Sequence, residues 1–153
     1  MFSRAIVRIP SKSLVNGLCS NNLGPPIYER AIEQHSEYIN ALKKCGLDVI
    51  VLDPDEDFPD STFVEDTAIL TPDVAIITNP GAPTRKGETK IIKSVLADFF
   101  QSIEIIEYPG TLDGGDILEY GNHYYIGLST RTNETGAKQL TKILDAYGML
   151  AST

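Results

Sequence analysis

Acidic side chains gather at two places where the chain enters an apolar run. The first is the stretch DSTFVED at 60–66, followed by the run 67–70, and the second is DGGD at 113–116, followed by Ile117 and Leu118. Two carboxylates on one side of a strand can receive a guanidinium group, because its planar fork of N–H donors matches carboxylate oxygens in pairs. The chemistry indicated is recognition of a flat cation such as the arginine side chain.

The spacing within the first stretch supports this interpretation. Asp60 and Asp66 stand an even number of positions apart, so an extended backbone points both side chains to one side and Glu65 to the other. The alternative is that these acids are solvated turn residues or helix caps, as single acids beside strands usually are.

Two arginines occupy equivalent places further along. Arg85 and Arg131 each follow an expected hairpin, and each is followed three residues later by an acid, Glu88 or Glu134. The arginines are suited to the α-carboxylate of an amino acid, which would complete the recognition of an arginine-like ligand. The alternative is that each arginine simply pairs with its neighbouring glutamate.

The elements that must position these residues recur in one order. Apolar residues at the 3.6-residue period predict helices at 28–45, 87–100 and 134–147. Alternating or short apolar runs predict strands at 5–9, 47–52, 67–70, 74–78, 103–108, 117–119 and 124–128. Acid, hairpin, arginine and helix repeat at about fifty residues, and a fixed period of this length is typical of propellers and solenoids. Each unit is expected to be ββαβ.

The predicted organisation is one domain, 1–153, of about three such units. After the helix at 134–147 only the residues 149–153 are available, so the third unit is expected to lack most of its closing strand. A partial ring would leave sheet edges and apolar faces uncovered. The chain is therefore expected to be a fragment, or to be completed by partners.

Composition excludes several classes of function. The net charge of −8 argues against binding nucleic acid, which needs clustered Lys and Arg. The chain has no apolar run near the ~20 residues of a membrane span and no signal-peptide pattern, so a cytoplasmic globular protein is expected. The two cysteines, Cys19 and Cys45, form neither a disulfide framework nor a zinc pair, and Cys45 is expected to be buried on a helix. No metal site is predicted.

Four stretches, in this order, resemble the dimethylarginine dimethylaminohydrolase family, within the superfamily of arginine deiminases and amidinotransferases. They are DSTFVEDTAIL at 60–70, NPGAPTRKGE at 79–88, LDGGDIL at 112–118 and GLSTRTNETG at 127–136. The resemblance covers essentially the whole chain. It implies a pentein-like α/β propeller of five ββαβ units, incomplete here. It also implies hydrolysis of Nω-methylated arginines to citrulline and methylamines, without a cofactor.

The resemblance also assigns roles to residues. It implies that Asp66 grips the guanidinium and that Asp113 orients a catalytic histidine. It implies further that Asp60 and Glu65 line the pocket and that Arg85 and Arg131 anchor the substrate's carboxylate. Leu18, in the loop 11–26, would belong to a lid over the pocket.

The chain departs from the family in its catalytic groups. The family uses a cysteine nucleophile near its C-terminus and a histidine after the third helix, and Cys19, Cys45, His35 and His123 match neither position. A thiolate and a general acid–base are both needed for this reaction. The chain is therefore expected to hold the substrate-recognition part and to be inactive alone. The alternatives are an arginine deiminase or amidinotransferase relative, and a non-catalytic module that binds arginine-like amino acids and self-associates.

Overall fold

The computed structural model describes residues 3–19 and 24–153, so the part of the expected lid at 20–23 lies outside the described residues. The chain divides into two compact units, Met1–Val64 and Glu65–Thr153. No helix among the described residues has the length and apolar character needed to cross a lipid bilayer.

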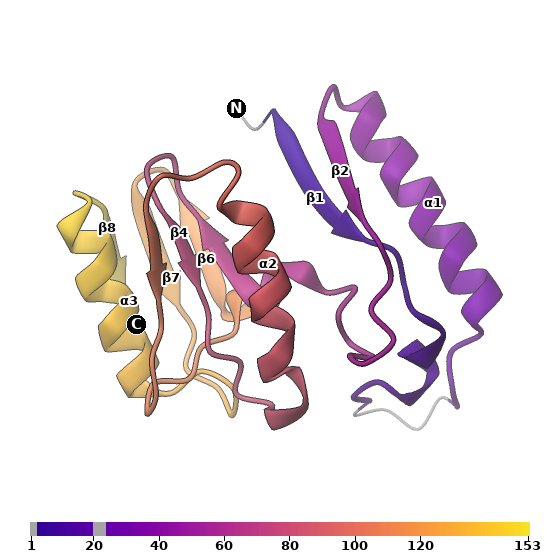
Figure 1. Cartoon of the computed structure of the whole chain (residues 1–153). Coiled ribbons are helices and arrows are strands. Elements are labelled where there is room, and N and C mark those ends of the chain that lie inside the picture. The colour runs from indigo at the N-terminus through magenta and orange to yellow at the C-terminus, as the bar shows by residue number, and fades with distance from the viewer. Residues whose placement is uncertain (1–2, 20–23) are drawn as a thin grey trace. The chain divides into compact units, whose positions relative to one another are not determined.

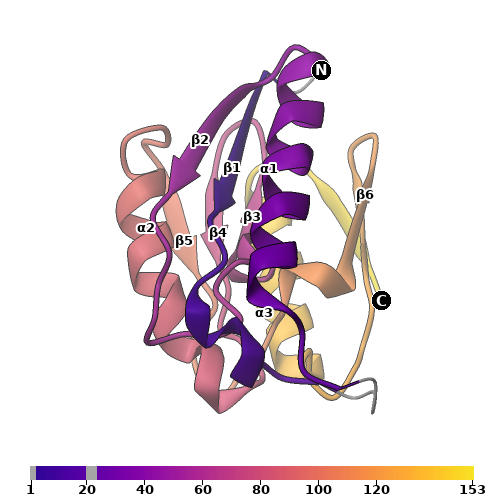
Figure 2. The same ribbon diagram turned by 90° about the vertical axis from the view of Figure 1, so that its right-hand side faces the viewer.

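The first unit is a β-α-β arrangement. Strand β1 (Arg4–Arg8) pairs in parallel with β2 (Asp48–Leu52), and helix α1 (Tyr28–Lys44) connects them and runs along the pair (Figures 1 and 2). Gly46, with φ of 84°, follows α1 in the left-handed conformation that favours glycine at a helix end. A short 3₁₀ helix, η1 (Lys12–Asn16), follows β1. The strand and helix expected at 5–9 and 28–45 are therefore confirmed.

The second unit contains two modules with the same order of elements. Each begins with a short 3₁₀ helix, continues through an antiparallel hairpin to a helix, and ends in a strand parallel to the second hairpin strand. The first module is η2 (Val64–Thr67), β3 (Ala68–Leu70), β4 (Ala75–Ile77), η3 (Pro83–Glu88), α2 (Thr89–Leu96) and β5 (Ile103–Ile105). The second is η4 (Gly114–Asp116), β6 (Ile117–Tyr120), β7 (His123–Ile126), α3 (Glu134–Ala146) and β8 (Leu150–Ser152). The predicted ββαβ repeat is present in both.

Local chemistry accounts for the turns and the helix start. Thr71 closes the first hairpin, because its Oγ1 accepts hydrogen bonds from the backbone N of Asp73 and of Val74. Asn133 caps α3 as expected, since its Oδ1 accepts from the backbone N of Gly136 at 2.8 Å. A Cβ at Gly136 would collide with the backbone carbonyl of Thr111, so glycine lets α3 approach that segment closely.

The apolar core of this unit joins both modules. It contains β4 and β7 side chains and the inward face of α3, which lies beside β7 and β8 in Figure 1. The residues that are completely buried include Val74, Ile76, Leu112, Leu140 and Leu144. Each buried aliphatic side chain of this kind stabilises a fold by about 1.5–3 kcal/mol relative to exposure. The core thus fixes the two 3₁₀ turns on a common support.

Several expectations need correction. The third unit does have a closing strand, because β8 pairs in parallel with β7 and has the same number of residues as β5. The helix expected at 87–100 begins as the 3₁₀ helix η3, and the α-helical part ends at Leu96. Cys45 is exposed, because it lies just past α1, a helix without a fully buried residue.

The larger architecture is α/β with small sheets. The described residues form one two-stranded and two three-stranded sheets and no closed ring. The single domain and the five-unit propeller therefore stay predictions.

Candidate functional site

Equivalent acids lie in the 3₁₀ turns that open the two modules. Asp66 belongs to η2 and Asp116 to η4, and each turn leads directly into a hairpin. The main chain at Asp66 is held in place by Thr78, whose Oγ1 donates to the Asp66 carbonyl at 2.7 Å. The acidic strand starts seen in the sequence are therefore short 3₁₀ turns anchored to the sheet.

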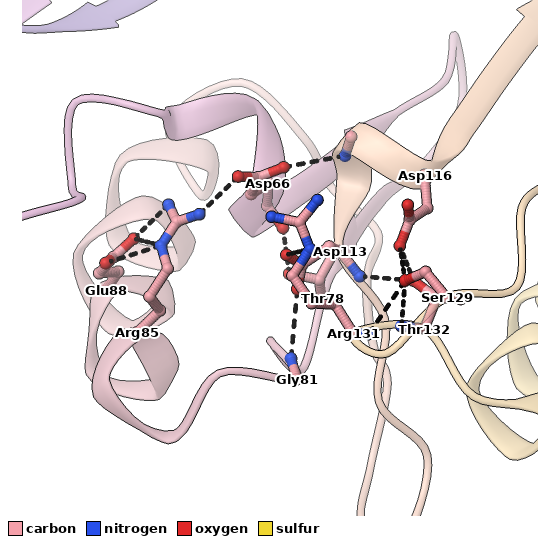
Figure 3. Close-up of polar contacts among 11 residues, drawn as sticks. Asp66, Thr78, Gly81, Arg85, Glu88, Asp113, Asp116, Ser129, Arg131 and Thr132 are labelled. Atoms are coloured by element: carbon pink, nitrogen blue, oxygen red, sulfur yellow. Dashed lines mark hydrogen bonds and ion pairs between the residues drawn. The ribbon is translucent and has the colours of Figure 1, made fainter. Parts of the chain in front are cut away.

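The Asp66 carboxylate joins the two turns. Its Oδ2 accepts a hydrogen bond from Arg85 Nη1 at 2.5 Å, and its Oδ1 accepts from the backbone N of Gly115 at 3.0 Å (Figure 3). A Cβ at Gly115 would lie 2.6 Å from Asp66 Oδ1, and one at Gly114 would collide with the carbonyl of Glu65. The glycine pair therefore allows close packing of the two turns. It also turns an N–H donor onto the acid.

Arg85 lies between two carboxylates. Its Nε donates to Glu88 Oε1 at 3.0 Å, and its Nη2 donates to Glu88 Oε2 at 2.8 Å. The Arg85 and Glu88 side chains are only 5% and 2% exposed. Burial lowers the pKa of Arg85, but the hydrogen bonds that Arg85 donates to Glu88 and Asp66 more than offset this effect, and the net shift is upward. Arg85 is therefore a fully charged group held by two acids.

Asp113 forms a second buried acid beside an arginine. Its Oδ1 accepts from the backbone N of Gly81 at 3.2 Å, and its Oδ2 lies 3.2 Å from Arg131 Nε. Desolvation raises the pKa of Asp113; the Gly81 hydrogen bond opposes this shift, and the Asp66 carboxylate adds to it. Within residues 3–19 and 24–153, Oδ2 accepts no hydrogen bond of good geometry, although Arg131 is close.

A turn at 129–132 presents Arg131. Asp116 Oδ2 accepts from Ser129 Oγ at 2.7 Å and from Thr132 Oγ1 at 2.6 Å, and Ser129 Oγ in turn accepts from the backbone N of Arg131 at 2.9 Å. Thr132 Oγ1 also accepts from the backbone N of Asp113 at 3.1 Å. This network fixes the main chain of Arg131 while its side chain stays half-exposed.

The cluster carries more negative than positive groups. It contains four carboxylates and two guanidinium groups. Figure 3 shows Asp66 and Glu88 beside Arg85 and Asp113 beside Arg131, whereas the Asp116 carboxylate is bonded to Ser129 and Thr132. A low-dielectric surrounding strengthens such interactions relative to water. The excess negative charge makes this cluster complementary to a cationic group. No group of three or more His, Cys, Asp or Glu side chains in the described part of the chain is arranged to hold a metal ion.

The structure brings together Asp66, Arg85, Asp113 and Arg131 in the unit Glu65–Thr153. Glu65 lies beside Asp66 in η2, and its pKa is raised, first by partial desolvation although the residue remains exposed.

Asp60 and Leu18 belong to the other unit. Both carboxylate oxygens of Asp60 accept from the backbone N of Leu18, at 3.0 and 3.2 Å, and the Leu18 side chain is exposed. The extended backbone expected at 60–66 is wrong, because these residues form turns and the start of η2. The local hydrogen bonds here are backbone turn bonds, from Ser61 N to the Phe58 carbonyl and from Phe63 N to the Asp60 carbonyl. Asp60 thus anchors the loop that carries Leu18.

The two arginines differ although their sequence settings match. Arg85 pairs with Glu88, as the alternative interpretation proposed, whereas Glu134 pairs with Lys138 at 3.2 Å and Arg131 pairs with Asp113. Sequence reasoning gave Glu88 no role beyond that possible pair, and it missed the contacts made by Gly115 and Thr132. The i, i+3 spacing of Arg85 and Glu88 was the sequence signal that could have pointed to a role for Glu88.

Solved structures define the class of fold. The chain matches the structure of a cysteine-to-serine variant of the Pseudomonas aeruginosa dimethylarginine dimethylaminohydrolase in complex with citrulline, with a TM-score of 0.98 and 50% identity. The match covers 99% of this chain and 60% of that one. It also matches the N-terminal domain of the cyanobacterial arginine dihydrolase ArgZ, with a TM-score of 0.83 and 18% identity over 96% of this chain and 55% of that one. The chain is thus an α/β protein of the pentein fold.

The family follows from sequence comparison. The model of the eukaryotic N,N dimethylarginine dimethylhydrolases matches residues 21–153, and the chain belongs to this family. The curated N(G),N(G)-dimethylarginine dimethylaminohydrolase of Pseudomonas aeruginosa is 50% identical over 153 residues, and that of Streptomyces coelicolor 38% identical over 146 residues. These alignments cover 99% and 95% of this chain. The chain spans about 60% of the length of these relatives, since the matches cover 60% and 57% of them.

Proposed function

We propose that this chain recognises the substrate in the hydrolysis of Nω-methylated arginines to citrulline and methylamines. Family membership supports the reaction class, and a relative has been solved with citrulline bound. The observation that carries the proposal is the Asp66 carboxylate, which is nearly buried and oriented by Arg85 and Gly115.

Asp66 is suited to the guanidinium of the ligand. Each of its oxygens accepts one of the two hydrogen bonds described above, and a carboxylate can accept about four in all. These contacts leave acceptor capacity in a fixed orientation for a further planar cation. Glu65, next in the same turn, is proposed to line the pocket. Its pKa is raised first by partial desolvation and then by the charge of Asp66, as suits a carboxyl group at the edge of a pocket.

The arginines are proposed to secure the carboxylate end. Arg131 has a half-exposed guanidinium on a rigid turn, so it can bind a ligand carboxylate without reorganising the main chain. Arg85 is already committed to Asp66 and Glu88, and its expected contact with the same carboxylate would have to be made alongside those bonds. By resemblance, Asp60 is proposed to line the pocket and Leu18 to belong to its lid; the backbone N of Leu18 donates to the Asp60 carboxylate.

Asp113 is proposed to orient a catalytic histidine. Its buried Oδ2 is a suitable acceptor for an imidazole N–H, and its desolvation strengthens that bond. By resemblance the nucleophile is a cysteine. Neither Cys19 nor Cys45 belongs to the unit Glu65–Thr153 that carries the acidic network. The contribution proposed for these residues is therefore binding and orientation, not cleavage of the C–N bond.

Calorimetry with citrulline and with asymmetric dimethylarginine tests the proposal, together with an assay for released methylamine. We expect binding by the wild type and a loss of about 10- to 100-fold in affinity in Asp66→Asn, because charge-assisted hydrogen bonds contribute about 1.5–3 kcal/mol. Asp73→Asn, at an exposed acid of the first hairpin turn, is the matched control and should bind as the wild type does.

Three results are informative. Binding without methylamine release supports a role in recognition alone. Methylamine release would place the catalytic groups within these residues. The absence of binding to either ligand would overturn the proposed function.

A further inference from the structure

We propose that Glu88 is a positioning residue, which locks the guanidinium of Arg85 against Asp66 and keeps the net charge there negative. The effect of Glu88 on ligand binding rests on the function proposed above, whereas the locking of Arg85 does not. Glu88 touches Arg85 and is not itself assigned a contact with the ligand.

The geometry of the pair supports orientation. Glu88 accepts from Nε and from Nη2 of Arg85, at 3.0 and 2.8 Å, so it occupies one whole edge of the guanidinium plane. Two parallel bonds fix the plane as well as the distance, which a single bond does not. The remaining terminal nitrogen, Nη1, is thereby directed to Asp66 Oδ2. Arg85 cannot rotate toward another acceptor without breaking both bonds to Glu88.

The balance of charges around Arg85 supports the second part of the proposal, that Glu88 keeps the net charge beside Asp66 negative. Arg85 alone would neutralise Asp66, and a neutral pair attracts a cation weakly. With Glu88 present, one guanidinium lies between two carboxylates, and all three side chains are about nine-tenths buried or more. The group therefore carries a net negative charge in a medium where charges are poorly screened. This charge is available to a ligand cation at Asp66.

The second module provides an internal comparison. Arg131 and Glu134 have the same spacing as Arg85 and Glu88, yet Glu134 is exposed and pairs with Lys138. Glu134→Gln is therefore a control of the same chemical change at the equivalent position of the repeat.

Locking can be measured without a ligand, from the Nε–H resonance of Arg85 in ¹⁵N NMR spectra. We expect this proton to exchange slowly with water in the wild type and in Glu134→Gln, and the Nε–H of Arg131 to exchange fast. In Glu88→Gln the Arg85 signal should exchange at least about tenfold faster, because a protecting hydrogen bond has been lost. Arg85→Lys assigns the signal by removing it. If the wild-type Arg85 Nε–H exchanges as fast as that of Arg131, the proposal is overturned, even if Glu88→Gln does not fold.

The charge effect can be measured with two probes of nearly the same shape. L-arginine carries a cationic guanidinium and citrulline a neutral ureido group. We expect Glu88→Gln to lower the affinity for L-arginine by about five- to tenfold at low salt, because a nearby negative charge has been removed. The affinity for citrulline should fall by less than about twofold. Equal weakening of both probes would indicate a merely structural role and would overturn the charge part of the proposal. If the wild type binds neither probe, the proposed function fails, while NMR still decides the locking.

Discussion

Arg131 Nε lies 3.2 Å from Asp113 Oδ2, and the two partners are buried to very different degrees: the arginine side chain is 49% exposed and the aspartate 0%. The acid is therefore held inside the protein while its counter-ion reaches solvent. Water and salt screen the arginine, so the pair offsets only part of the desolvation of the carboxylate. This agrees with the upward shift of the Asp113 pKa.

The raised pKa of Asp113 predicts a pH dependence of stability. Because the folded pKa lies above the ordinary value of 3.8, Asp113 favours the folded state most below pH 3.8, and this contribution is lost as the pH rises through the folded pKa. Asp113→Asn has no such titration. We therefore expect the free energy of unfolding of this variant, relative to wild type, to rise across that window in denaturant titrations at a series of pH values. Asp145→Asn, an exposed acid on α3, is the control, and a pH-independent difference for Asp113→Asn would contradict the assignment.

The hydroxyl of Thr132 is expected to stabilise the turn that presents Arg131. Thr132→Val keeps the shape but removes both the donor to Asp116 and the acceptor for the backbone N of Asp113. We expect a loss of about 1–3 kcal/mol in the free energy of unfolding, because buried polar groups lose a partner. Thr130→Val, at an exposed position of the same turn, should change little. Equal stability of the two variants would argue against the network.

Leu140 tests the common core of the two modules. It is completely buried on α3, so Leu140→Ala should destabilise the chain by about 2–5 kcal/mol through lost burial and a cavity. Leu150, in β8, is 60% exposed, and Leu150→Ala should have a much smaller effect. Thermal and chemical denaturation measure both. Since the core supports η2 and η4 together, a partial unfolding transition in Leu140→Ala that leaves β3–β4 intact would contradict this account.

The anchoring of Leu18 by Asp60 is expected to appear in backbone hydrogen exchange. Asp60→Ala removes both acceptors of the Leu18 N–H, so this amide should exchange faster. Glu56→Ala is a control in the same unit, because Glu56 accepts from the backbone N of Lys12 and of Ser13 instead. It should speed exchange at those two amides and leave Leu18 unchanged. Unaltered exchange of Leu18 in Asp60→Ala would show that other contacts hold the loop.

The repeat was predictable from the sequence, because its signals are local. Apolar periodicity located α1 and α3, and Asn133 marked the start of α3 through its capping hydrogen bond. The recurrence of acid, hairpin and arginine predicted repeated units of one plan, of which the unit Glu65–Thr153 contains two, and the four motifs predicted the family. Each of these features depends on residues that are close together in the chain.

Pairing across the fold was not predictable in this way. The closing strand β8 was missed, because its three residues carry little periodicity and gain their partner only when β7 lies alongside. The extended conformation at 60–66 was wrong, because backbone turn bonds such as Phe63 N to the Asp60 carbonyl form there. The carboxylates of Asp60 and Asp66 find their backbone partners in distant segments, at Leu18 and Gly115.

The sequence by itself determined the kinds of charged residue and their order, since helix period, turn residues and repeat spacing are local properties. Only the tertiary structure decided which charges meet. Arg85 and Arg131 occupy equivalent places in the repeat, each three residues before a glutamate, yet one is buried between Asp66 and Glu88 and the other reaches solvent beside Asp113. The physical reason is burial. A charge removed from water must find a partner among the groups that packing brings near, and those groups come from distant parts of the chain.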